Sequence, residues 1–224
     1  MEYKRSQVED SLWSLFRSGS APLRLPSAFR FRIKKLLDLD RIDDPGMEGV
    51  PLAFNDARAE GQGQDVPFTS FHAFMLGLAL EIWNAGLKQN DVVFFLRHCR
   101  RLIEAEHARI LVAGIVPHQV MAPLPGWPVR KLNGATVADT SVYMVMDRIG
   151  MTDTASFPIA SPEARQRPLF FAPQFCGGLA ALTDFFAEVS TARRTHLVVE
   201  LSELAVRLDQ LLSTTPARRR GRPS

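Results

Sequence analysis

The sequence has little cysteine and no long hydrophobic run. Its 224 residues include two cysteines, Cys99 and Cys176, which are too few for a disulfide framework or a four-thiolate metal site. Apolar runs such as residues 74–80 and 110–116 are only about seven residues long, whereas a membrane-spanning helix needs roughly 20. Residues 1–7 lack the apolar segment of a signal peptide. We therefore expect a protein of the reducing cytoplasm with no membrane partner.

Motifs that carry enzymatic chemistry are also missing. No Gly-x-Gly-x-x-Gly opens a helix, and no Walker loop, Gly-x-Ser-x-Gly elbow or His-Glu-x-x-His occurs. Glu104 and His107 form one Glu-x-x-His, but a carboxylate metal site needs a second copy and further acids. Cys99 and Cys176 are interpreted as structural thiols. We therefore predict a non-enzymatic protein with no catalytic residue, metal or cofactor, while an enzyme of unrecognised type stays open for residues 134–195.

Positive charge, by contrast, is concentrated at two places. The formal net charge is +3, and four arginines lie within the last seven residues, so residues 1–217 carry −1. A second group of cations contains no acid: Arg24, Arg30, Arg32, Lys34 and Lys35. Clustered cations on a nearly neutral body favour phosphate binding, because neutralising phosphates releases condensed counterions. The alternative is a solvated face together with a tail that keeps the protein soluble.

Hydrophobic periodicity predicts four helices in the first half of the chain: residues 6–17, 27–41, 70–85 and 88–112. Ser27 and either Thr69 or Ser70 are the expected N-caps. The second helix would bury an apolar stripe and present a basic front, a shape that enters a DNA groove. The apolar seam of the long fourth helix would serve either as core or as a surface that pairs with a partner, and its opposite, exposed face is charged and includes Arg97 and Arg100.

Two short extended runs lie between the second and third predicted helices. Residues 51–54 and 66–69 flank a Gly-rich polar connection whose single cation is Arg58. This pattern predicts a hairpin that projects as a wing, and the alternative is a plain surface loop.

The second half of the chain opens with a proline-rich stretch, residues 114–133, which predicts a linker between domains. Residues 141–149 and 168–172 are then predicted strands, and 179–189 a helix. Leucines spaced three or four residues apart predict a last helix, although Val198 and Val199 leave its start open to a strand. These leucines are Leu197, Leu201, Leu204, Leu208 and Leu211.

The order of the elements in residues 6–112 resembles the DNA-binding module of MerR-type winged-helix regulators. The stretch 66–78 and the stretch 85–96, with its Ala85-Gly86 break, carry the resemblance. In that family a hairpin wing precedes such a helix, and a long helix then pairs two subunits. The resemblance implies a homodimer and a groove-facing role for four cations: Arg30, Arg32, Lys34 and Lys35.

We therefore expect an α+β fold, mainly α, in four parts. Residues 1–113 would form a winged-helix-like DNA-binding and pairing domain, and residues 114–133 the linker. Residues 134–215 would form a smaller α+β domain of unknown role, and residues 216–224 a basic tail.

The basic tail resembles an AT-hook, whose core is Arg-Gly-Arg-Pro with flanking cations. Glycine lets the backbone lie on the floor of a narrow minor groove, and the arginines enter along it. A·T-rich duplex is the implied partner, because its minor groove is narrower and more negative. The residues expected to bind are Arg218, Arg219, Arg220, Gly221 and Arg222.

These features together predict a cytoplasmic, nucleoid-associated transcriptional regulator that binds double-stranded DNA. The basic helix would enter the major groove, Arg58 would contact the backbone, and the tail would add a tethered contact. An unknown small effector could bind within residues 134–195. The competing interpretation is a non-enzymatic scaffold or interaction protein whose tail binds RNA or an acidic partner.

Overall fold

The computed structural model describes residues 1–42, 49–57, 66–114, 122–124, 126–148, 172–189 and 195–217. Its helices are α1 (Arg5–Phe16), α2 (Ser27–Asp40), α3 (Ser70–Asn84), α4 (Gln89–Ala113), α5 (Gly178–Val189) and α6 (Ser202–Thr214). Its strands are β1 (Val129–Leu132), β2 (Ala135–Ala138), β3 (Val142–Arg148), β4 (Gln174–Gly177) and β5 (Thr195–Glu200). The fold is α+β and mainly α, as predicted.

The four N-terminal helices begin and end within a residue or two of their predicted positions. Thr69 caps α3, since its hydroxyl accepts the backbone N–H of His72 at 3.2 Å while Thr69 N–H donates to the His72 ring at 3.2 Å. Gly114 ends α4 with φ of +61°, a left-handed conformation that costs glycine little.

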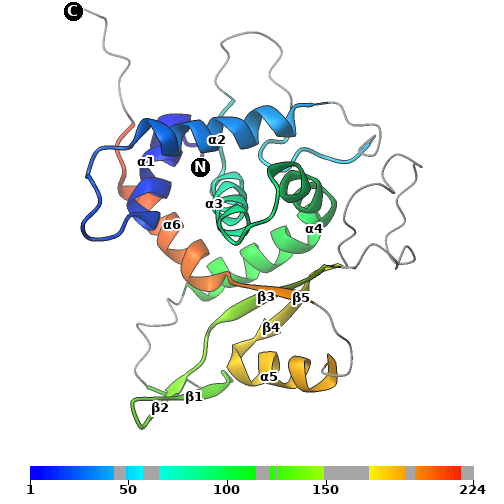
Figure 1. The fold of residues 1–224 in the computed structure, drawn as a ribbon. Helices are drawn as coiled ribbons and strands as arrows, with labels where there is room; N and C mark the ends of the chain where they lie inside the picture. The colour runs from blue at the N-terminus through cyan, green and yellow to red at the C-terminus, as the bar shows by residue number, and fades with distance from the viewer. Residues whose placement is uncertain are drawn as a thin grey trace, which may run out of the picture.

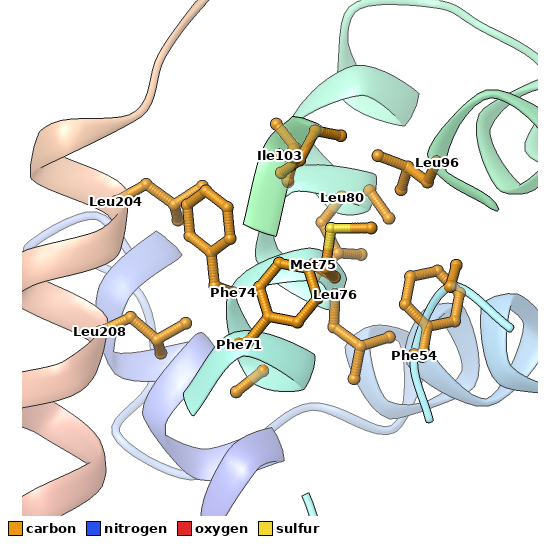
Figure 2. Close-up of a cluster of buried hydrophobic side chains, with 14 of the residues drawn as sticks. Phe54, Phe71, Phe74, Met75, Leu76, Leu80, Leu96, Ile103, Leu204 and Leu208 are labelled. Carbon is orange, nitrogen blue, oxygen red and sulfur yellow. The ribbon is translucent and has the colours of Figure 1, made fainter. Parts of the chain in front are cut away.

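Helix α3 occupies the centre of the helical body, with α1, α2, α4 and α6 around it (Figure 1). Eleven of its 15 residues are buried. A helix enclosed on most sides must be apolar nearly all round, which its sequence satisfies. Its side chains meet those of the surrounding helices in one hydrophobic cluster (Figure 2), which includes Phe74, Met75, Leu96, Ile103, Leu204 and Leu208.

The three-stranded antiparallel sheet, in the order β4-β3-β5, closes this core from below in Figure 1. Successive strand residues face opposite sides. Met144 and Met146 of β3 therefore join the helical core, whereas Val145 faces Cys176 and Leu182 in a second, small cluster under α5. The strand predicted at residues 141–149 is confirmed as β3.

The last leucine-rich segment is part strand and part helix. Leu197 belongs to β5, and α6 begins at Ser202, where the Glu200 carboxylate accepts the backbone N–H groups of Ser202 and Glu203 at 2.8 and 2.9 Å. Helix α6 packs on α1, α3 and α4 and shares their hydrophobic cluster. The expected division at residues 114–133 therefore does not separate two cores, because α6 completes the core of the N-terminal helices.

The end of the predicted linker forms β1, which pairs with β2, directly after the linker, in a hairpin. Asn133 and Gly134 have φ of +50° and +83°, the two left-handed residues of a tight hairpin turn. Asn-Gly is the sequence signal for this turn, and it directly follows the prolines that favour a linker. Strand β4 was not predicted either, and the strand expected at 168–172 lies outside the described residues except for Ala172, which is not in a strand.

Candidate nucleic-acid interface

Helix α2 lies along the outside of the helical body (Figure 1) and carries Arg30, Arg32, Lys34 and Lys35, four of the five cations of the second group. Ile33, Leu36 and Leu37 are buried against α3 and α4, as the apolar stripe predicted. Lys34 and Lys35 are exposed, and Phe31 between the cations is 65% exposed. The helix thus has the buried back and charged front expected from its sequence.

The cations of α2 do not form one groove-facing row. Arg30 pairs with Glu9 of α1 at 3.1 Å, whereas Arg32 donates to the Asn84 side chain of α3 at 2.6 Å. The Arg32 guanidinium also lies 4.4 Å from the ring centre of Trp83. At about 100° per residue, positions 30 and 32 fall on opposite flanks of a helix. The expectation of one groove-facing set is thus wrong for Arg30 and Arg32, whose charged groups bind neighbouring helices.

The two lysines of α2 also differ in their surroundings. Lys34 pairs with Asp38 at 2.5 Å, one helical turn further along, and both side chains are about half exposed. Such a surface pair contributes little and exchanges readily with water or phosphate. Lys35 is exposed at the middle of the outer face. Lys34 and Lys35 therefore remain accessible to a polyanion.

The hairpin wing is not formed by the residues expected to build it. Residues 51–54 make no strand, and Phe68 instead pairs with Tyr3 through two backbone hydrogen bonds of 2.8 and 2.9 Å. Leu52 and Phe54 are buried, which excludes a projecting hairpin. Arg58 lies outside the described residues.

A buried polar network holds the segment 49–57 where the wing was expected. Asp40 accepts the backbone N–H groups of Ala53 and Phe54 at 2.9 and 3.0 Å, and burial raises its pKa. Arg97 donates to the carbonyls of residues 50 and 51, and Arg100 to those of residues 52 and 55. These two arginines are 4% and 6% exposed, so the prediction that they lie on a solvent face is wrong.

The same network reaches the surface at Asp56. Arg100 pairs with the Asp56 carboxylate, and the His72 ring lies 3.2 Å from it. Burial lowers the pKa of His72, against the effect of Asp56. Two loop carbonyls and the Asp56 carboxylate accept hydrogen bonds from Arg100, so we assign the network to fixing the loop on α4. Spacing alone could not reveal it, because its members are distant in sequence.

The root of the arginine tail lies against α1. Thr215, directly after α6, accepts from the Gln7 side chain through its carbonyl at 2.9 Å, and its hydroxyl is 3.0 Å from that of Ser11. Glu9, between these two residues, is the partner of Arg30 in α2. The start of the tail is therefore adjacent to α1, which the Glu9–Arg30 pair joins to the cationic helix α2. The predicted tail residues themselves lie outside the described residues: Arg218, Arg219, Arg220, Gly221 and Arg222.

The candidate metal and thiol residues are separated or buried. His107 packs against Phe74 with ring centres 4.6 Å apart, whereas Glu104 is exposed. Burial raises the pKa of Cys99 to about 12, and the pKa of Cys176 is also raised by burial. Within the described ranges, no three His, Cys, Asp or Glu side chains gather as a metal site requires.

Comparison with known proteins returns no match among family models, curated proteins or solved structures. In the part of the chain that the structure describes, no helix is both long and apolar enough to cross a membrane.

Proposed function

We propose that this protein binds duplex DNA through the surface of α1 and α2 together with the arginine tail. The observation that carries the proposal is the anchoring of Thr215 on Gln7 and Ser11, which brings the root of the tail beside the N-terminal helices. Residues 1–42 carry nine cations and five acids, and residues 218–222 add four arginines. The root of the basic tail thus lies on the same side of the molecule as the N-terminal helices.

Electrostatic attachment supported by a tethered tail fits this arrangement better than a recognition helix. Arg30 and Arg32 stabilise the contacts of α2 with its neighbours, whereas Arg24 and Lys35 are exposed and Lys34 is exposed and paired only with Asp38 of its own helix. The tail would enter the minor groove of A·T-rich duplex. Attachment of the two segments to one body raises the effective concentration of each for the same duplex. Association with the nucleoid is part of this proposal.

Fluorescence anisotropy with a labelled A·T-rich duplex over a salt series tests the proposal. The full-length variant R218A/R219A/R220A/R222A loses four phosphate-neutralising groups, so the slope of log K against log[salt] should fall by about 3.6. The variant K35A should lower it by about 1. The control K131A, on the β1–β2 hairpin at the far end of the molecule in Figure 1, should leave it unchanged.

An unchanged slope on removal of the four arginines would refute the role of the tail. Equal or higher affinity for RNA of the same length would favour the interaction protein that binds RNA. If the protein bound DNA and RNA no better than an acidic polypeptide, and the slope of log K against log[salt] were the same for all three, an acidic protein partner would be favoured.

A further inference from the structure

An open cleft of about 370 Å³ lies at the C-terminal end of α1, away from the contact of Gln7 and Ser11 with Thr215. It lies between the ends of α1 and α3, the strand β5 and the first turns of α6. Its walls are apolar at Phe16 and Val198 and acidic at Glu81, Glu200 and Glu203. The single cation in its lining, Arg207, is paired with Glu203 at 2.9 Å. The cleft therefore has a net negative charge.

Glu81 is the unusual residue of this cleft. It is the only carboxylate in α3, whose sequence is otherwise almost wholly apolar. The side chain is partly buried, and this burial raises its pKa. Glu200 faces the same space and is held in place by its hydrogen bonds to the N-terminus of α6. An acid placed on an apolar wall is stabilised by an arriving cation, because the cation restores the interactions that burial removed.

The cleft follows the free edge of β5. Four consecutive residues, 197–200, line it. Val198 and Val199 point to opposite faces of the sheet, opposite Val145 and Met144 of β3, so the space runs along the edge of the strand and not over one face. Among the described strands, none pairs with β5 on this side. An exposed edge offers backbone N–H and C=O groups to an extended segment.

We propose that the arginine tail of the same chain docks in this cleft, extended along β5, with its arginines against Glu81 and Glu200. The chemistry matches, because the tail brings four arginines and no acid to a cleft with three glutamates. Arginine also packs its planar group against aromatic and aliphatic walls such as Phe16.

The tail is long enough to reach the cleft. Helices α1 and α6 run antiparallel, since Thr215 meets Gln7 and Ser11 while the cleft lies beside Phe16 and Arg207. From Thr215 back to Arg207 or Glu203 is roughly 12–18 Å along the helix. Residues 216–222 span up to about 23 Å when extended. Arg222 can therefore lie in the cleft while Thr215 stays anchored, and Arg220 reaches the end of the cleft at Arg207.

Docking gives the tail two alternative sites, the cleft and the DNA groove. This consequence rests on the proposed function, whereas the docking itself does not. A tether of this length gives an effective concentration on the order of mM, so even weak contacts populate the docked state. If half of the molecules are docked, abolishing the cleft contacts raises the affinity of the tail for DNA about twofold.

Paramagnetic broadening in the full chain tests the docking directly. A nitroxide is attached through S224C, since Cys99 and Cys176 are buried and should react far more slowly than a thiol at the end of the tail. At low salt, the amides of residues 197–200 and 203–207 should be broadened. The variant E81Q should reduce this broadening, and the control E188Q, an exposed glutamate on α5, should not.

Equal broadening of the cleft amides in the labelled protein and in its R218A/R219A/R220A/R222A variant would overturn the proposal. So would broadening seen only when a labelled chain is mixed with an isotopically enriched, unlabelled copy, since the tail would then dock on a second molecule. Broadening with no effect of the four arginines on DNA affinity would retain the docking and refute the proposed function. DNA binding that depends on the tail, without broadening of the cleft amides, would support the proposed function and refute the docking.

Discussion

Single residues decide how the charged side chains of this protein are used. Arg97 and Arg100 lie on an amphipathic helix at positions that spacing alone assigns to solvent, yet both are buried. Each guanidinium donates to two backbone carbonyls of the segment 49–57, which has no strand or helix to satisfy them. A sequence shows where arginines are, but it does not show which distant loop lacks donors. This part of the structure could not be predicted.

His107 should make stability depend on pH. It is 5% exposed, and burial lowers its pKa to about 4. In the unfolded chain this histidine binds a proton near pH 6.5, whereas in the folded chain it stays neutral down to about pH 4. The free energy of unfolding therefore falls as the pH drops from 6.5 to 4 and does not change with this group at higher pH. H107L lacks this titrating group. When the pH is lowered from 7 to 5, the free energy of unfolding of H107L should therefore rise by about 2 kcal/mol relative to that of the wild type. Urea unfolding at the two pH values measures the change, and a constant difference would contradict it.

At the scale of elements, sequence signals were sufficient wherever caps and periodicity agreed. The helices α1 to α4 were predictable because an apolar stripe and clear end signals coincide, as at Thr69 and Gly114. The junction of β5 and α6 was not, since the leucine spacing continues through it: Leu197 packs from the strand and Leu204 from the helix. The strand β5 and the helix α6 bury leucines against the same core, so the spacing of leucines in the sequence does not show where the strand ends and the helix begins. The prediction of a hairpin wing was wrong because the apolar residues of this segment pack in the core and do not form a hairpin.

The contact of α3 with α1 and α6 should depend on the absence of a side chain at Gly77. A Cβ at this position would lie 3.1 Å from a methyl of Leu204 and 3.2 Å from one of Leu12. We expect G77L to reduce the free energy of unfolding by about 1–3 kcal/mol or more through overpacking. The matched control is A105L, at an exposed position of α4, which should change it by less than about 0.5 kcal/mol. Partial recovery in G77L/L204A, measured by urea unfolding, would locate the strain, and equal effects at both positions would contradict it.

At the scale of the whole molecule, the chain is divided by the sheet and not by the proline-rich stretch. One face of β3 and β5 belongs to the large core that α6 completes, and the other face supports only the small cluster under α5. The first and last helices are thus parts of one body, which is why the tail emerges beside the N-terminal cations. A prediction from sequence assigns domains to contiguous segments of the chain. No local pattern in the sequence indicates that α6 completes the core of the N-terminal helices.

The two native thiols report separately on these two clusters. Cys99 lies in the large core and Cys176 in the small one, and both are buried. Because few contacts hold α5, Cys176 should be labelled through local opening at urea concentrations where Cys99 still resists. In L208A the free energy of exposing Cys99 should fall by about 2–5 kcal/mol, since Leu208 of α6 packs in the same core. In L182A only Cys176 should become easier to label. If residues 134–215 were an independent domain, L208A would instead affect Cys176 and spare Cys99, and rates of thiol labelling against urea distinguish the two.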